Sequence, residues 1–317
     1  MIVMRGEAAA VVSVVMSVFN DAHQLPSTME SILGQRDVAL ELIVIDDGST
    51  DESGRILDSF AQRDARVRVI HQENRGLTRA LIRGCLEARA SYVARHDSGD
   101  TSDPDRLRKQ KAVLDANPEV VFVSCWTNVV GPNDELLFIA PGTGSATEPR
   151  SILDANAEWG VSAGPSSHPS VMFRADAYRD AGGYRAEFYY GQDWDLWYRL
   201  AERGKFQMIP EALYTTRVDL RTISSSARGA QSEFATLSLA AMKARAAGNS
   251  DADVLKLATN VQRKRKTWFS EARGLYFIGE ALRRNGDERA RAYLMRAVRS
   301  CPLHAKAWLR LAQTFFP

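Results

Sequence analysis

Short apolar runs alternate with amphipathic segments through the N-terminal part of the chain. Residues 11–18 are rich in valine and uncharged, and residues 40–45 form a second run of the same kind, as expected of strands buried on both faces of a parallel sheet. Shorter strands are predicted at residues 67–70 and 91–95, with apolar residues at helical spacing between them. This alternation predicts a doubly wound α/β domain, whose mostly parallel sheet is covered by helices on both faces.

The pattern is less regular beyond Pro104. A helix follows this proline and ends before Pro118, and a second helix is predicted at residues 193–203. A loop is expected at residues 141–145. The further strands are predicted at residues 120–124, 136–139, 171–173 and 212–218. The last of them would close the sheet.

The C-terminal part is rich in alanine, leucine and arginine, and no strand-like run remains there. We therefore divide the chain into an α/β domain, residues 1–225, and a helical region, residues 226–317. Residues 297–312 resemble part of a tetratricopeptide unit, but one partial copy does not define a repeat. The basic run at residues 263–266, with Trp268, would let this region contact a partner protein, a second copy or a membrane surface. Packing against the α/β domain is the alternative.

Composition and charge narrow the class of protein. The 317 residues are 45% hydrophobic and 25% charged, as in a soluble globular protein, and the net charge of +2 is too small for bulk affinity to nucleic acid. Cys85, Cys125 and Cys301 are widely spaced, which favours neither a disulfide framework nor a zinc cluster and fits a reducing cytoplasm. The apolar stretch at residues 8–19 is too short for a signal peptide or a membrane span.

Several common catalytic motifs are missing. The first predicted strand is followed by residues 19–23 (FNDAH) rather than by the glycines of a dinucleotide-binding turn, which disfavours an NAD enzyme. The same segment lacks the glycine-rich loop with a basic residue that a sugar-1-phosphate nucleotidyltransferase needs. No P-loop, zinc-binding H-E-x-x-H or G-x-S-x-G nucleophile motif occurs in the sequence.

Two acidic turns follow predicted strands, at residues 46–51 (DDGSTD) and 97–100 (DSGD). Ligands bind beyond the carboxyl ends of strands in open α/β sheets, so these acids predict a site for a nucleotide-sugar and a divalent cation. Asp46 and Asp47 would hold the nucleoside, and Asp97 and Asp100 the cation on the diphosphate. The alternatives are an ordinary Asp-Gly turn and helix-capping acids.

These motifs resemble those of the family 2 glycosyltransferases, which have the GT-A fold, a Rossmann-like α/β architecture with a mixed sheet. The resemblance extends over about residues 10–220 and rests on several ordered motifs. They are VVSVVMSVFN from Val11, IDDGSTD from Ile45, RHDSGD from Arg95 with PDRL from Pro104, HPSVMFR from His168, GGY from Gly182 and GQDWDLW from Gly191.

The resemblance assigns roles to individual residues. Asp47 matches the acid that contacts the base, and Asp97 begins the D-x-D element that holds the metal, Mg²⁺ or Mn²⁺, and the nucleotide. Gly99 stands where the second acid is expected, so either Asp100 replaces it through a shifted turn or the metal is held more weakly. The further residues expected to contact the nucleotide-sugar are Ser17, Phe19, Asn20, Asp46, Ser98, His168, Trp194 and Arg75, the last placed in the helix after the third strand.

Asp193 matches the family's catalytic base, in a Gln192-Asp193 pair where the family usually has Glu-Asp. A single carboxylate is enough to take the acceptor's proton in an inverting transfer, and the loss of the neighbouring acid should tend to lower its pKa. The alternative role for Asp193, or for Asp195, is to cap the helix that follows.

The resemblance therefore implies an inverting glycosyltransferase that moves a sugar from a nucleotide donor, a UDP-sugar, to a hydroxyl of a glycan or lipid-linked saccharide. Surface or extracellular polysaccharide synthesis is the expected setting, in the cytoplasm and in peripheral contact with the inner membrane face. The alternative is a catalytically weak or inactive nucleotide-sugar-binding protein or scaffold of the same fold, an idea motivated by Gly99 and the helical tail.

Overall fold

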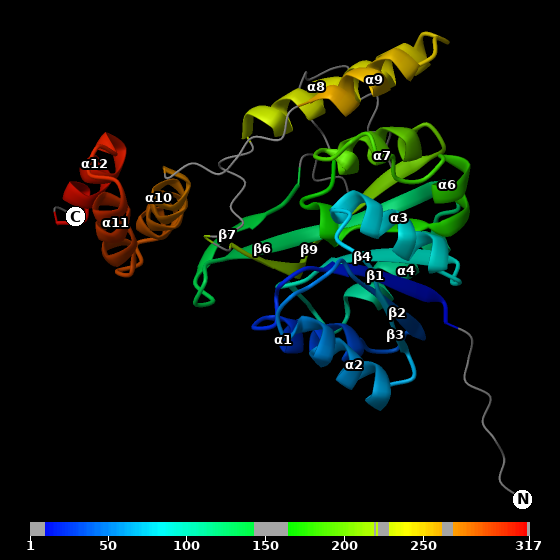
Figure 1. Cartoon of the computed structure of the whole chain (residues 1–317), viewed down its shortest axis with the longest axis horizontal. Helices are drawn as coiled ribbons and strands as arrows, with labels where there is room; N and C mark the ends of the chain where they lie inside the picture. The colour runs from blue at the N-terminus through cyan, green and yellow to red at the C-terminus, as the bar shows by residue number, and fades with distance from the viewer. Residues whose placement is uncertain (1–9, 143–163, 219, 221–227, 262–268, 316–317) are drawn as a thin grey trace, which may run out of the picture.

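The computed structural model describes residues 10–142, 164–218, 220, 228–261 and 269–315. The described residues form a nine-stranded sheet in the order β3-β2-β1-β4-β8-β6-β9-β5, with β7 paired to β6 (Figure 1). The strands are β1 Val12–Val18, β2 Leu40–Asp46, β3 Val67–His71, β4 Tyr92–Asp97, β5 Thr101–Ser102, β6 Val120–Val130, β7 Leu136–Ala140, β8 Met172–Arg174 and β9 Lys205–Arg217. The predicted mixed sheet is confirmed.

The two acidic turns meet at one edge because of the register of the central strands. β1 pairs in parallel with β2 on one side and with β4 on the other. Val18 lies opposite Asp46, and Ser17 lies opposite Asp97. The carboxyl ends of β2 and β4 therefore flank the end of β1, which is where ligands bind in such sheets.

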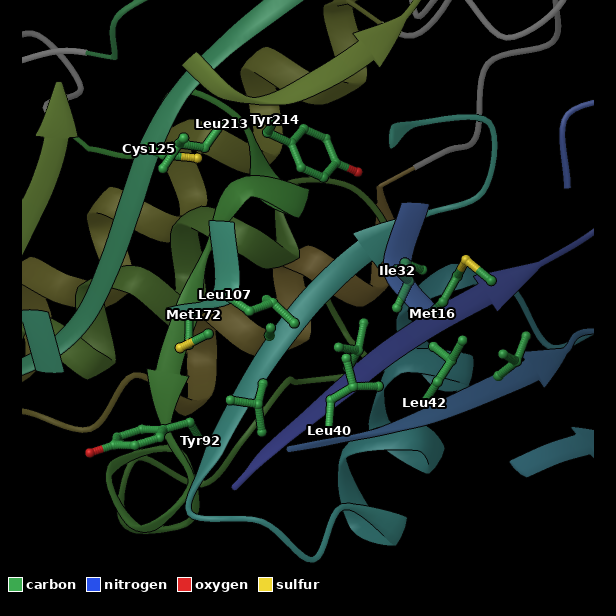
Figure 2. Packing of buried hydrophobic residues seen from close by; sticks show 14 of the residues in the cluster. Met16, Ile32, Leu40, Leu42, Tyr92, Leu107, Cys125, Met172, Leu213 and Tyr214 are labelled. Carbon is green, nitrogen blue, oxygen red and sulfur yellow. The ribbon is translucent and has the colours of Figure 1, made fainter. Parts of the chain in front are cut away.

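Helices cover both faces of the sheet, as the apolar pattern predicts. Alternate residues of β1, Val12, Val14 and Met16, point into a core shared with α1, α2 and α4, and Val15 points into a second core with α3, α6 and α7. Figure 2 shows part of the first core. The helices of this part of the chain are α1 Leu25–Leu33, α2 Ser53–Arg63, α3 Leu77–Glu87, α4 Arg106–Ala116, α6 Ala175–Asp180 and α7 Gln192–Ala201. Full burial of each large apolar side chain stabilises the fold by about 1.5–3 kcal/mol.

The least accurate prediction is the last strand. β9 begins at Lys205, seven residues earlier than the predicted 212–218, and it lies between β6 and β5 instead of closing the sheet. Pro210 interrupts the run, since proline has no N–H for the ladder, and the pairing with β6 shifts between Cys125 and Trp126. The sequence pattern therefore predicts a strand only for the part of β9 that follows the proline. The two-residue β5 and the short α6 were also not predicted.

The C-terminal helices form two groups. They are α8 Arg228–Ala246, α9 Ala252–Asn260, α10 Phe269–Arg284, α11 Ala290–Ser300 and α12 Ala305–Gln313. α8 packs on α7, whereas α10 to α12 lie beyond the β6–β7 hairpin (Figure 1). In the second group, Leu275 and Ile278 share a core with Leu137 of β7, and the Tyr293 hydroxyl donates to Glu135 at 2.6 Å.

The helical region is therefore packed against the α/β domain, which is the alternative considered from the sequence. The basic run at residues 263–266 and Trp268 lie outside the described residues, so their contact with a partner or a membrane stays a prediction, as does the division at residue 225. Within the described part of the chain, no helix is long and apolar enough to span a bilayer.

Candidate active site

The first acidic turn is tied to the end of β1. Asp46 accepts a hydrogen bond from the Ser49 N–H at 3.0 Å, and its other carboxylate oxygen lies 2.8 Å from Nδ1 of His71. Asn20 has a φ of 52° and its side-chain oxygen accepts from the Thr50 N–H at 2.7 Å. Asp46 and Asn20, both predicted to contact the donor, thus also hold the backbone of the turn in place.

Asp47 is buried, and its carboxylate organises the loop before α3. It accepts from the Gln72 side-chain amide at 2.7 Å and from the N–H groups of Arg75 at 2.9 Å and Gly76 at 2.8 Å. Arg75 therefore lies in this loop, not in the helix as predicted, because α3 begins at Leu77 after the positive φ of Gly76. Contact between Asp47 and a base stays a prediction, since three protein donors already face this carboxylate.

Phe19 is an exposed aromatic side chain at the end of the sheet where the two acidic turns lie. It is 51% exposed directly after β1, although its neighbour Val18 is fully buried. Ser17, predicted to line the same site, is half-buried at the end of β1. An exposed aromatic face between two acidic turns can stack on a planar base.

The second acidic turn presents Asp97 to solvent and binds its backbone to β9. The Asp97 side chain is 36% exposed, and one carboxylate oxygen lies 2.6 Å from Nη2 of Arg95. The Asp97 N–H donates to the Tyr214 hydroxyl at 3.1 Å. The next residue, Ser98, donates its hydroxyl to Oδ2 of Asp21 at 2.5 Å. Asp97 is thus the acid of this turn that is available to a ligand.

The side chain of Asp100 is directed toward β9 and not toward solvent. Its buried carboxylate accepts from the Tyr214 hydroxyl at 2.9 Å, from the Thr216 hydroxyl at 3.0 Å and from the Arg217 N–H at 3.0 Å, all on β9. Burial and the charge of Asp97 raise the pKa of Asp100 to about 7. Among the described residues, no group of three or more His, Cys, Asp or Glu side chains is arranged to hold a metal ion. The metal role of Asp100 stays a prediction, and its contacts are those of a residue that fastens the turn to the sheet.

The Asp100→Asn variant tests this structural role. Because the pKa of Asp100 is raised in the folded state, ionisation of the wild-type side chain costs stability as pH rises from about 4 toward 7. Asparagine does not ionise and can keep hydrogen bonds to Tyr214 and Arg217. We therefore expect the stability of the variant relative to wild type to increase between pH 5 and pH 8, measured by urea unfolding at each pH. A difference independent of pH would contradict the burial of this carboxylate.

Arg95 is a functional candidate that the sequence prediction missed. Its side chain is 2% exposed, and Nε and Nη1 have no hydrogen-bond partner in the described structure. Its charge acts on both Asp97 and Asp193, which lie far apart in the chain. The available signal was an arginine inside a predicted strand, directly before the second acidic turn, since a buried cation needs compensating partners.

Asp193 lies in the first turn of α7, close to the second acidic turn. The helix begins at Gln192 after Gly191, whose φ is 67°, so neither Asp193 nor Asp195 is the N-cap and that alternative is wrong. Asp195 is instead buried and ion-paired with Arg199 at 2.6 Å. Burial raises the pKa of Asp193, while the Trp194 N–H and the charge of Arg95 oppose the rise. The expected decrease from the missing neighbouring acid is therefore outweighed by desolvation.

His168 and Trp194 both lie in an aromatic group beside α7. Nε2 of His168 is 2.7 Å from the Tyr184 hydroxyl, and burial lowers the pKa of this histidine well below its usual value, so it is neutral. The Trp194 ring meets that of Trp197 edge to face, with centroids 4.9 Å apart. Their contacts with a donor or an acceptor stay predictions.

Comparison with known proteins identifies the class. A family model described as "Glycosyl transferase family 2" matches residues 13–179, more than half of the chain. The chain belongs to this family and is a glycosyltransferase. It is 36% identical over 215 residues to EpsE of Bacillus subtilis (strain 168), a protein named as a glycosyltransferase, covering 66% of this chain and 73% of EpsE. It is 28% identical over 204 residues to chondroitin synthase of Escherichia coli, covering 64% of this chain and 28% of that protein.

Solved structures support the fold. S. aureus TarS 1-349 in complex with UDP has a TM-score of 0.53 at 17% identity, with 96% of this chain and 88% of that one covered. The mannosyltransferase PcManGT from Pyrobaculum calidifontis, in complex with GDP-Man and Mn²⁺, has a TM-score of 0.54 at 15% identity, with 96% and 84% covered. The predicted GT-A fold is confirmed.

Proposed function

We propose that this protein is an inverting glycosyltransferase that moves a sugar from a UDP-sugar to a hydroxyl of a glycan or lipid-linked saccharide, in the synthesis of a surface or extracellular polysaccharide. The observation that carries the proposal is the grouping of Asp97, Arg95 and Asp193 at the mouth of the sheet. One acid is partly exposed at the end of β4, the other lies in the first turn of α7, and the charge of the buried guanidinium acts on both.

The proposed reaction is a single displacement at the anomeric carbon of the donor sugar. The acceptor oxygen forms a bond to this carbon while the bond to the diphosphate oxygen breaks, and Asp193 takes the proton of the attacking hydroxyl. The raised pKa of Asp193 makes it a stronger base than an ordinary aspartate. At the other end of the crevice, Phe19 and the turn of Asp46 and Asp47 would hold the nucleoside.

A divalent cation, Mg²⁺ or Mn²⁺, fits the donor set at the second acidic turn. Magnesium sites commonly use one or two carboxylates together with substrate phosphates, and Asp97 offers a partly exposed carboxylate there. A bound cation would stabilise charge on the departing diphosphate. The protein's own contribution is to hold Asp97 in place through Arg95 and through the Tyr214 hydroxyl, which accepts from its backbone N–H.

The donor and the pathway are proposed from relatives. TarS 1-349 has been solved with UDP and with UDP-GlcNAc, which favours a UDP-sugar, whereas the mannosyltransferase was solved with GDP-Man and Mn²⁺. The similarity to EpsE and to chondroitin synthase favours polysaccharide synthesis. A screen of UDP- and GDP-sugars with Mn²⁺ or Mg²⁺, read as nucleotide release and as transfer to saccharide acceptors, tests the proposal. Failure of every donor to turn over would contradict it.

Gly99 keeps a second function under consideration, a protein that binds the nucleotide-sugar without efficient turnover. Its motivation is that the turn lacks a side chain where the family resemblance expects an acid. In this case UDP would raise the melting temperature, as any ligand that binds only the folded state does, while no donor would be hydrolysed or transferred. Measurable transfer from one donor would exclude this alternative.

Phe19→Ala tests the nucleoside end of the site. Stacking of a base on an aromatic ring is worth about 1–3 kcal/mol, so we expect the Kd for UDP to rise roughly fivefold or more, measured by calorimetry. The matched control is Phe138→Ala, which removes another exposed aromatic side chain, on β7 and beside Phe277, and should leave the Kd unchanged. Equal affinities for wild type and Phe19→Ala would show that the base binds elsewhere.

A further inference from the structure

The second acidic turn has no side chain at Gly99, and a carboxylate from another loop lies next to this position. Gly99 has a φ of +89° and no side chain, and a Cβ atom built on it would have one neighbour within 4 Å outside its own turn, Oδ2 of Asp21 at 3.4 Å. Asp21 follows β1, and its carboxylate therefore lies in contact with the point from which a side chain at position 99 would start. A carboxylate is present here even though the turn itself does not supply it.

Asp21 is held there by contacts at both ends of the residue. Its N–H donates to the Ser53 hydroxyl at 2.9 Å, and the Ser98 hydroxyl donates to its Oδ2 at 2.5 Å. The residue that follows, Ala22, donates its N–H to Asp51 at 3.1 Å. Ser98 lies directly after Asp97, so these contacts place the Asp21 carboxylate against the turn that carries Asp97. The arrangement is preorganised, because it uses backbone and short side chains from three loops.

A second observation at the same turn points to an anionic ligand. The guanidinium of Arg95 contacts Asp97 through Nη2, is 2% exposed, and leaves Nε and Nη1 without a hydrogen-bond partner in the part of the chain that the structure describes. A buried cation with free donors is stabilised by an anion. Two carboxylates and one such cation form a donor set that suits a diphosphate bridged by a divalent cation.

We propose that Asp21 provides the second carboxylate of this cation site, in place of an acid at position 99, and that it works together with Asp97. Asp100 then remains free for its role on β9, where three donors hold it. The inference rests on the proposed function, since the cation would bind together with the diphosphate of the donor. It assigns a residue to the site that neither the acidic turns nor their spacing indicated.

The test compares UDP binding in Mn²⁺ and in EDTA by calorimetry, with full-length protein. We expect Mn²⁺ to tighten UDP binding by wild type at least tenfold, and Asp21→Asn to lose most of this gain while its Kd in EDTA stays within about twofold of wild type. Asparagine keeps an oxygen acceptor for Ser98, so the turn should survive the change. Glu52→Gln is the control, because it alters an exposed acid just before α2 whose side chain pairs with Arg55 and not with the second acidic turn, and it should keep the gain.

A second variant distinguishes ligation of the cation by Asp21 from a structural role of this residue. Gly99→Asp in the Asp21→Asn background returns a carboxylate to the turn at the cost of a strained φ, and it should restore part of the Mn²⁺ gain if the role is ligation. The paramagnetic spectrum of Mn²⁺ in the ternary complex with UDP provides a readout independent of turnover. Full Mn²⁺ gain in Asp21→Asn, or wild-type binding of UDP that ignores Mn²⁺, would overturn the inference but leave nucleotide binding intact. Absence of UDP binding in wild type would contradict the proposed function itself.

Discussion

Asp193→Asn is expected to reduce kcat by about a thousandfold while UDP binds with its wild-type Kd within about threefold. General base catalysis by a positioned side chain contributes typically 10²–10⁴-fold, and asparagine removes the proton acceptor while keeping nearly the same shape. UDP should still bind, because the residues proposed for the nucleoside lie at the ends of β1 and β2, away from α7. The measurements are steady-state transfer kinetics and calorimetry with UDP.

The matched control for this variant is Asp176→Asn. Asp176 is an exposed acid in the first turn of α6, and its carboxylate accepts from the N–H of the next residue, the same local contact that Asp193 makes in α7. The Asp176→Asn variant should have wild-type activity.

The pH dependence of the wild-type enzyme gives a further test of Asp193. Only the ionised carboxylate accepts the proton, so kcat should fall as the pH is lowered. Because the pKa of Asp193 is raised, this fall should begin at a higher pH than for an ordinary aspartate. Full turnover by Asp193→Asn would end the assignment.

Arg95→Met is expected to lower kcat by about a hundredfold without lowering the melting temperature. The guanidinium is buried with two unpaired nitrogens, so its replacement by an apolar side chain of similar length is neutral or stabilising for folding. Activity, in contrast to folding, should require the guanidinium, because its charge holds Asp97 in place and opposes the rise in the pKa of Asp193. A loss of about 2–3 kcal/mol of transition-state stabilisation corresponds to this change in rate.

Two further readouts separate this positioning role from a structural one. Removal of the charge should move the acid limb of the kcat–pH profile to higher pH, and Arg95→Lys should return part of both the rate and the profile. Arg106→Met is the contrasting control. Arg106 is fully buried but satisfied, donating to the carbonyls of Arg95 and Pro169, so its loss should lower the melting temperature. An unchanged pH profile in Arg95→Met would contradict the proposed coupling.

Much of the fold followed from local pattern. The valine-rich run of β1 and the apolar run of β2 are continuous, and their burial on both faces needs no knowledge of their neighbours. β9 was the exception. Pro210 interrupts its apolar pattern, and the strand continues on both sides of this proline because it pairs with β6, which is distant in the sequence. The docking of α10 on the β6–β7 hairpin likewise depends on contacts between distant segments.

The sequence by itself determined the fold class, the family and the two acidic turns, because these depend on periodicity and on residue types at short spacing. Tertiary structure decided what each acid does. Desolvation raises the pKa of Asp193 even though its neighbour is the uncharged Gln192. The carboxylate of Asp100 is hydrogen-bonded to β9, so it does not replace the acid that is missing at Gly99. Arg95 and Asp21 acquired their positions only when β1, β4 and α7 came together, since burial and distances between side chains arise from packing and are not encoded in local spacing.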